Sequence, residues 1–150
     1  TGLTHDERGY PRTESAEAQT ELVQRLCNKI RKNKQKIIRV QSAIIEDAEV
    51  AVVAYGIAAR AALSAVRKAR AAGIKAGLLR LVTLWPFAEE QVAQVARRVK
   101  AIVVPEMNCG QIVREVERAA KETPVILLPK LGEEPHKPDE ILEAIGGIQK

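Results

Sequence analysis

The sequence predicts an α/β fold in which helices cover both faces of a parallel sheet. Three apolar segments, at 51–55, 77–84 and 101–104, are separated by two amphipathic stretches. A strand, helix, strand, helix, strand order is the sequence sign of a parallel sheet. Apolar and polar residues do not alternate within these segments, as expected for strands that crossover helices bury on both faces.

The two amphipathic stretches carry apolar residues at helical spacing, with charged residues opposite. The apolar faces consist of Ala59, Leu63, Val66 and Ala69 in the first stretch, and of Val92, Val95, Ala96 and Val99 in the second. Gly73 stands where the first helix has to end, a usual position for a C-terminal cap. Pro86 cannot continue the strand before it.

Before the sheet, residues 1–12 lack any periodicity and read as a loop, or as an arm or linker from a preceding domain. A helix is expected from Thr13 or Ser15, whose hydroxyl groups can cap it. Its predicted buried face consists of Leu22, Val23, Leu26, Cys27 and Ile30, which makes Cys27 an ordinary small core residue. Residues 36–47 are then expected to supply an edge strand or an extended connection.

After the third strand, the sequence predicts a helix, a short strand at 125–128 and a final helix. The first of these helices carries Ile112, Val113, Val116 and Ala120 on its apolar face. Pro138 suits the first turn of the last helix, and Gly146 and Gly147 are expected to end it. His136, between two prolines, is expected to be exposed.

Gly56 is the first candidate functional residue, because it directly follows a central strand and precedes a helix. Backbone N–H groups at such a position can bind an anion. However, the chain contains neither GxGxxG nor GxxxxGK[ST], the fingerprints of dinucleotide and Walker-type sites. A tight turn from the strand into a packed helix is the favoured explanation of a glycine here.

The stretch "VPEMNCGQ" is the second candidate, and it contains Pro105, Glu106, Asn108 and Gly110. These residues are predicted to lie beyond the carboxyl end of the third strand, where open α/β sheets place ligands or partner contacts. Alternatively, Glu106 only caps the N–H groups of the next helix. Cys109 is either a thiol activated by that helix N-terminus or a half-buried, inert residue.

Composition restricts the function classes. The 150 residues suffice for a single domain, predicted to span 1–150 as a fragment of a longer subunit because the chain begins with Thr1.

The net charge is +5, but the basic cluster at 29–36 lacks aromatic partners, so nucleic-acid binding is not favoured. No apolar run reaches the roughly 20 residues of a membrane helix. Two cysteines without metal-ligand spacing indicate a cytoplasmic protein, and neighbouring His5, Asp6 and Glu7 do not predict a metal site.

Four stretches in order, "TGLTHDERGYP", "AYGIAAR", "RLVTLWPF" and "PEMNCGQ", together resemble the C-terminal part of the α subunit of 2-oxoacid:ferredoxin oxidoreductases. The resemblance is strongest to the 2-oxoglutarate type and extends to the terminal "LGEEPHKPDEILEAI". It implies the fold of the transketolase C-terminal domain, a three-layer α/β/α sandwich around a mixed, mostly parallel sheet of about five strands. Residues 36–41 would supply its antiparallel edge.

Enzymes of that family oxidatively decarboxylate a 2-oxoacid to an acyl-CoA and reduce ferredoxin, with thiamine diphosphate, Mg²⁺, coenzyme A and iron–sulfur clusters. The resemblance therefore implies a noncatalytic domain that binds none of these cofactors itself. Its implied partners are the other domains of the α subunit, the β subunit and possible further subunits, with ferredoxin reached through the whole enzyme. Gly56, Glu106, Asn108 and Gly110 are carried over only as candidates for structural turns or interdomain contacts, and no catalytic residue is expected.

A rival hypothesis is an autonomous flavodoxin-like module that binds an anion or a nucleotide. It would use Gly56 and the loop at 106–110, whose positions at strand ends favour it. The absence of phosphate-binding fingerprints counts against it.

Overall fold

The computed structural model describes residues 3–148, so the outermost two residues at each end of the predicted domain lie outside the described range. The contacts divide the chain into two compact units, one up to Ile37 and one from Ile38 on. That both belong to one domain over 1–150, with an arm at 1–12, stays a prediction.

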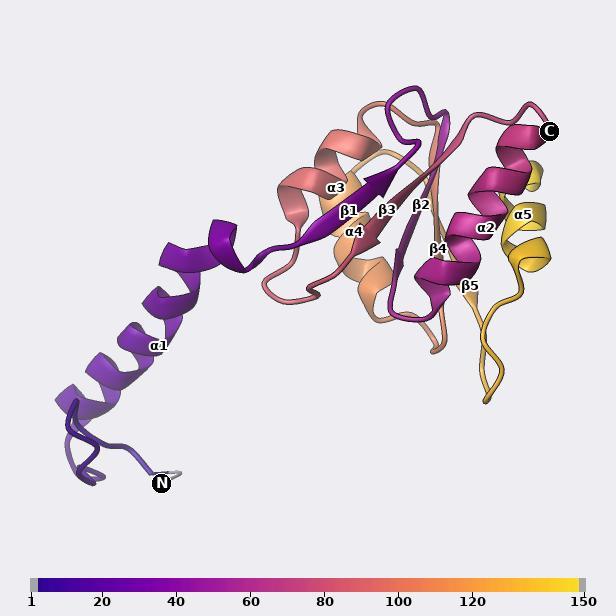
Figure 1. Cartoon of the computed structure of the whole chain (residues 1–150). Helices are drawn as coiled ribbons and strands as arrows, with labels where there is room; N and C mark the ends of the chain where they lie inside the picture. The colour runs from indigo at the N-terminus through magenta and orange to yellow at the C-terminus, as the bar shows by residue number, and fades with distance from the viewer. Residues whose placement is uncertain (1–2, 149–150) are drawn as a thin grey trace. The chain divides into compact units, whose positions relative to one another are not determined.

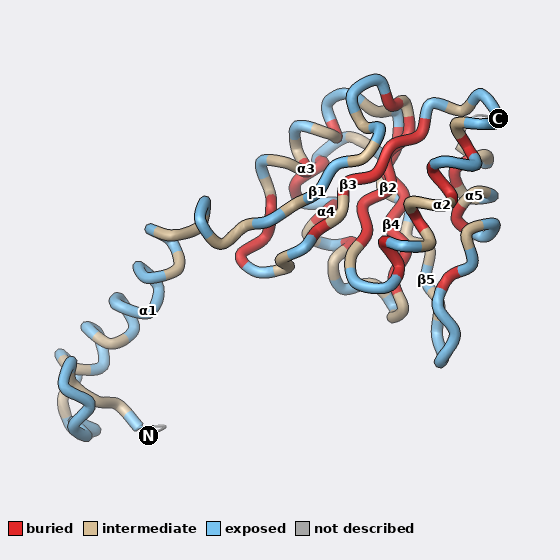
Figure 2. The backbone as a smooth tube through the Cα atoms, viewed as in Figure 1, coloured by how far each residue is buried: buried red, intermediate tan, exposed pale blue. Residues whose placement is uncertain are grey.

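The first unit contains a loop, joined by an antiparallel bridge between His5 and Pro11, and helix α1, Ala16–Ile37. The Ser15 hydroxyl accepts a hydrogen bond from the Ala18 N–H at 3.1 Å, which confirms one of the two predicted caps. None of the residues of α1 is buried, as Figure 2 shows by the absence of red along this helix. The predicted buried face is therefore wrong, and Cys27 is exposed instead of lying in a core.

The second unit is built on a five-stranded sheet with the order β1-β3-β2-β4-β5. Its strands are β1 Val40–Ala43, β2 Val50–Tyr55, β3 Ala76–Leu81, β4 Ala101–Glu106 and β5 Val125–Pro129. Only β1 is antiparallel to its neighbour, and the pairs β2–β3, β2–β4 and β4–β5 are parallel. The predicted mixed sheet of mostly parallel strands is confirmed, with β1 as the antiparallel edge.

Helices cover both faces of this sheet (Figure 1). On one face, α2 (Ala58–Ala71) and α5 (Pro138–Gly147) bury a core with β2 and β3. On the other, α3 (Glu89–Ala96) and α4 (Ile112–Ala120) bury a second core with the same central strands. The predicted three-layer sandwich is thus confirmed.

The two cores explain why the central strands are continuous apolar segments in the sequence. The five residues from Val50 to Ala54 have no exposed surface, because their side chains alternate between the two helical layers. Helix α2 contributes mainly alanines to its side, and Ala62, Ala65 and Ala69 are fully buried. These small side chains let the helix backbone lie close to the sheet.

Most predicted element ends agree with the structure, and several do not. Gly73 has a φ of +83° just beyond α2, as a C-terminal cap requires, and Pro138 begins α5. Gly146 and Gly147 belong to α5 and do not end it, and β3 ends at Leu81, three residues earlier than predicted. His136 is only 4% exposed, and its Nε2 lies 2.9 Å from the Leu128 carbonyl oxygen. Its predicted exposure is wrong.

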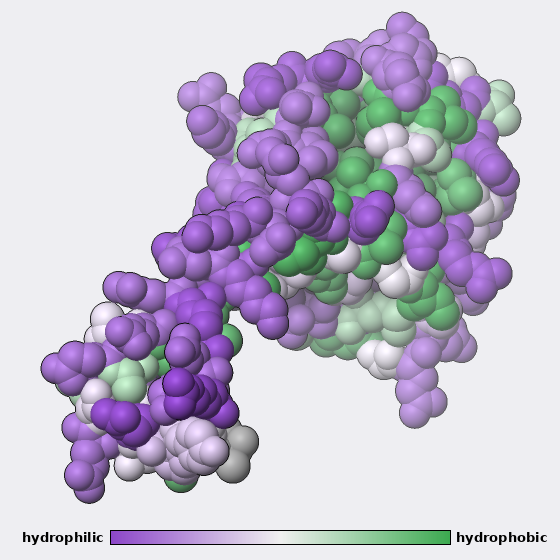
Figure 3. All heavy atoms as spheres, turned by 60° about the vertical axis from the view of Figure 1, so that its left-hand side comes forward, coloured by the Kyte–Doolittle hydropathy of each residue, from purple (hydrophilic) through white to green (hydrophobic). Residues whose placement is uncertain are grey.

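The surface of the larger unit carries hydrophobic areas between hydrophilic side chains (Figure 3). Within residues 3–148, no helix is long and apolar enough to cross a membrane.

Candidate functional site at the strand ends

The carboxyl ends of β2 and β4 lie side by side, because these parallel strands are neighbours in the sheet. Tyr55 is the last residue of β2 and Glu106 the last residue of β4. The sequence had predicted that Pro105 and Glu106 lie beyond the end of the third strand. This prediction is wrong, because both residues belong to β4. The loop that follows β4 contains Asn108 and Gly110 and leads into α4.

Glu106 has no exposed surface, although it is a charged residue. Its Oε2 accepts hydrogen bonds from the N–H groups of Gln111 at 3.2 Å and Ile112 at 3.0 Å. Its Oε1 accepts one from the N–H of Val113 at 2.7 Å. N–H groups in the first turn of a helix have no acceptor within the helix, so this carboxylate satisfies them and complements the positive end of the helix dipole.

These hydrogen bonds determine the charge state of Glu106. Burial on its own raises the pKa of a carboxyl group, because it disfavours the charged form. The N–H groups at the start of α4 and the Tyr55 hydroxyl outweigh this effect and hold the pKa of Glu106 below 4.5. At neutral pH the strand end therefore holds a buried, ionised carboxylate.

Tyr55 and Asn108 extend this network toward the loop. The Tyr55 hydroxyl donates to Glu106 Oε2 at 3.0 Å and accepts a hydrogen bond from Asn108 Nδ2 at 3.1 Å. Asn108 Oδ1 in turn accepts one from the Gly110 N–H at 2.7 Å. Burial is the main reason why the pKa of Tyr55 is raised above 10. The resulting chain of contacts joins β2, β4 and the loop before α4.

The structure brings Glu106, Asn108 and Gly110 together, whereas Gly56 makes none of these contacts. Both glycines adopt the left-handed conformation, with φ of +53° at Gly56 and +98° at Gly110. A Cβ atom at Gly56 would meet nothing within 4 Å, but one at Gly110 would lie 3.0 Å from side-chain atoms of Leu127 and Val113. Backbone conformation therefore accounts for both glycines, and close packing also accounts for Gly110.

Tyr55 is the functional residue that the sequence reasoning missed. It precedes Gly56 at the end of a buried strand, where a polar hydroxyl group needs a partner. The sequence predicts that the carboxyl ends of the parallel strands lie at the same edge of the sheet. It does not predict the order of the strands, which makes Tyr55 a neighbour of Glu106.

The chemistry of the site follows from these contacts. Three N–H groups at the start of α4, those of Gln111, Ile112 and Val113, could bind a phosphate but are occupied by the protein's own carboxylate. Cys109 is exposed, so its predicted half-burial is wrong. Within the described range, no three His, Cys, Asp or Glu side chains gather in a way that could hold a metal ion. The arrangement fixes two strand ends to a helix.

Large apolar side chains are exposed next to this network. Ile57, which follows β2, is 56% exposed, and Trp85, in the loop after β3, is 70% exposed. The register pairs Tyr55 with Leu81, so the segments after β2 and β3 begin at the same edge of the sheet. A contiguous exposed apolar patch would be typical of a surface that contacts another protein or domain.

The chain is similar to proteins of one family. The family model described as pyruvate:ferredoxin oxidoreductase core domain II matches residues 48–141. The 2-oxoglutarate synthase subunit KorA of Methanothermobacter marburgensis is 45% identical over 150 residues, which is 99% of this chain. The chain spans 40% of the length of that relative.

Two solved structures share the fold. A 2-oxoglutarate:ferredoxin oxidoreductase from Magnetococcus marinus, with 2-oxoglutarate, coenzyme A and succinyl-CoA bound, matches all of this chain and 26% of its own, with a TM-score of 0.84 and 22% identity. A split-gene transketolase, an inactive tetramer, matches 72% of this chain and 41% of its own, with a TM-score of 0.62 and 21% identity. The transketolase-like fold expected from the sequence is thereby confirmed.

Proposed function

Because this chain belongs to the pyruvate:ferredoxin oxidoreductase core domain II family, we propose that it is a noncatalytic assembly domain of a 2-oxoacid:ferredoxin oxidoreductase α subunit. The name of the 45% identical relative supports 2-oxoglutarate as the oxoacid. The whole enzyme would convert it oxidatively to an acyl-CoA and reduce ferredoxin in the cytoplasm. Its partners would be the other domains of the subunit, the β subunit and possible further subunits.

The buried Glu106 carboxylate is the observation that carries the noncatalytic role. In α/β folds, ligands commonly bind at the carboxyl ends of parallel strands. Here that place is filled by a side chain of the same protein, held by four donors. The strand ends therefore act as a structural joint, and we assign Gly56, Asn108 and Gly110 to the turns around it.

The described residues do not fit the cofactors that the family implies. The diphosphate of thiamine diphosphate binds through Mg²⁺ and oxygen ligands, and residues 3–148 contain no cluster of three potential metal ligands. An iron–sulfur cluster is commonly held by four cysteines, whereas this chain has two, both exposed. We therefore assign thiamine diphosphate, Mg²⁺, coenzyme A and the iron–sulfur clusters to other parts of the enzyme.

The proposed role can be tested in the complete subunit, expressed together with its partner subunits. We expect that removing residues 38–148 abolishes both assembly, measured by gel filtration, and 2-oxoglutarate-dependent reduction of ferredoxin or a dye. The control is Cys109→Ser, which changes an exposed side chain near the strand ends and is expected to preserve both. Intact assembly and activity after the deletion would contradict the proposal.

The autonomous binding module is the alternative, and it predicts a different result. Ligands that bind only the folded state raise the melting temperature of this chain. We expect no saturable shift with thiamine diphosphate plus Mg²⁺, coenzyme A or common nucleotides. A saturable shift that Gly56→Val removes would instead establish a binding site at the end of β2.

A further inference from the structure

A groove of about 150 Å³ lies between the edge strand β1 and helix α3, away from the strand-end network. Helix α3 packs over the central part of the sheet, and β1 extends the sheet beyond it at the edge. The side chains of Val40 and Ser42 point toward α3, since alternate residues of a strand share a face. The groove is thus a consequence of the edge strand, which α3 does not cover completely.

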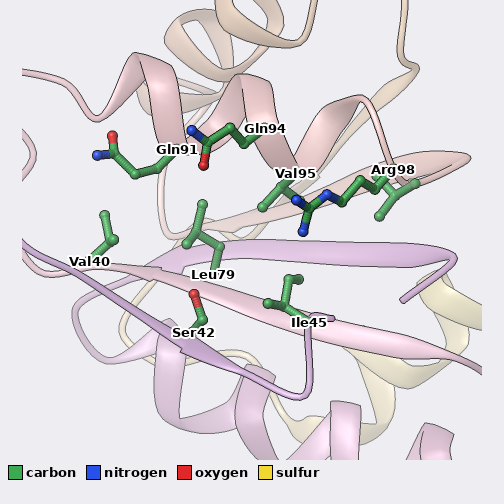
Figure 4. A pocket seen from close by; sticks show the side chains of 9 residues that line it. Val40, Ser42, Ile45, Leu79, Gln91, Gln94, Val95 and Arg98 are labelled. Carbon is green, nitrogen blue, oxygen red and sulfur yellow. The ribbon is translucent and has the colours of Figure 1, made fainter. Parts of the chain in front are cut away.

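The floor and the rim of this groove differ in chemistry. Val40, Ile45, Leu79 and Val95 provide an apolar surface. Figure 4 shows the Ser42 hydroxyl on the strand side, and the Gln94 amide and the Arg98 guanidinium group on the helix side. Within residues 3–148, the structure gives these three polar side chains no hydrogen bond or ion pair. They are therefore available to a ligand.

These polar groups select a class of ligand. A guanidinium group binds a carboxylate through two parallel hydrogen bonds, and a serine hydroxyl can donate a further one. Ser42 lies opposite Leu79 in the register of β1 and β3, so an acid held at the rim would lie over apolar side chains. One guanidinium group next to an apolar surface favours a ligand that has a single negative charge and an aliphatic chain.

We propose that this groove binds a small aliphatic carboxylate. The Arg98 guanidinium group pairs with the carboxylate, the Ser42 hydroxyl donates to it, and the aliphatic part lies against Leu79 and Val95. The Gln94 amide provides an additional hydrogen bond at the rim. This site does not depend on the proposed role of the domain in an oxidoreductase.

The test is an NMR titration of this chain with sodium isobutyrate at constant ionic strength, with isobutyramide as a neutral probe of the same shape. We expect saturable shifts at Leu79 and Val95 with isobutyrate and none with isobutyramide. Arg98→Gln should weaken binding about tenfold or more, because it removes a charge-assisted hydrogen-bonded pair. Arg97→Gln is the matched control, since it removes the same charge from an adjacent exposed residue that does not line the groove.

Three results would overturn the proposal. They are equal binding of isobutyrate and isobutyramide, equal losses in Arg97→Gln and Arg98→Gln, or shifts that do not saturate. Arg98 and Ser42 are exposed, so Ser42→Ala provides a second variant that does not endanger folding. It should weaken isobutyrate binding less than Arg98→Gln does, because it removes one neutral donor.

Discussion

Glu106 ends a fully buried strand with a negative charge, and the chain around it supplies the donors that this charge needs. One hydrogen bond comes from Tyr55, which is 51 residues away in the sequence, and three come from the helix that follows. The local part of this arrangement could be predicted, because a glutamate just before a helix is a candidate cap. The partner on β2 could not, because it depends on which strands become neighbours.

The first prediction concerns Glu106→Gln. This substitution keeps the shape of the side chain but removes its charge and places an NH₂ group opposite backbone N–H donors. We expect the free energy of unfolding to fall by about 2–3 kcal/mol, because a buried hydrogen-bonded charge is replaced by a partly unsatisfied amide. Urea denaturation followed by circular dichroism measures this loss. Glu117→Gln, on the exposed face of α4, is the control, and equal stability of the two variants would contradict the role of Glu106.

The second prediction concerns the pH dependence of stability. The folded-state pKa of Glu106 is below 4.5, so the unfolded chain binds more protons than the folded chain in this range. The contribution of Glu106 is therefore fully present above its unfolded pKa and is lost as the pH falls through the folded pKa. We expect the free energy of unfolding to decrease more steeply below pH 4.5 in the wild type than in Glu106→Gln. Parallel urea titrations from neutral to acidic pH measure the difference, and identical slopes would be incompatible with a lowered pKa.

At the scale of elements, periodicity predicted which segments form helices and strands better than it predicted what covers them. Helix α1 forms where the sequence places it, yet none of its residues is buried. An amphipathic pattern shows that a face is suited to contact with apolar surface, but it does not identify that surface. His136 illustrates the converse: a polar residue expected to be exposed is buried, with the Leu128 carbonyl group as a hydrogen-bond partner of its Nε2.

The third prediction compares the glycines that connect strands to helices. Gly56 and Gly110 both have positive φ, so alanine at either position should cost about 1 kcal/mol of stability for the backbone conformation. Only Gly110→Ala also places a methyl group 3.0 Å from Leu127 and Val113. We expect Gly110→Ala to be less stable than Gly56→Ala by at least about 1 kcal/mol in urea denaturation. The reverse order would mean that the loop before α4 adjusts freely to a Cβ atom.

At the scale of the whole molecule, the layered architecture was predictable because the β-α pattern and the continuous apolar strands each indicate it. The antiparallel edge came from the resemblance and not from periodicity, since four residues in β1 are too few to reveal a direction. The exposed residues at the strand ends were not predicted as a group. In the proposed α subunit their role would depend on the parts outside this chain, which spans 40% of the length of its relative.

The last prediction concerns Trp85 in the complete enzyme. The loop that carries it is anchored by the buried residues Pro86 and Phe87, so the indole ring is held outward at 70% exposure. If the surface at the carboxyl ends of β2 and β3 contacts the rest of the enzyme, Trp85→Ala should weaken assembly about tenfold or more, because large aromatic anchors dominate binding at interfaces. Native mass spectrometry over a dilution series of the purified enzyme measures the shift toward dissociated subunits.

The chain alone separates this effect from a loss of folding. An exposed side chain contributes little to stability, so Trp85→Ala should change the free energy of unfolding of the 150-residue chain by less than about 0.5 kcal/mol. Leu131→Ala is the matched control, because Leu131 is equally exposed at 70% but follows β5 at the far edge of the sheet. Weakened assembly in Trp85→Ala alone would establish the surface at the carboxyl ends of β2 and β3 as the contact surface. Unchanged assembly, or the same loss in Leu131→Ala, would refute this assignment.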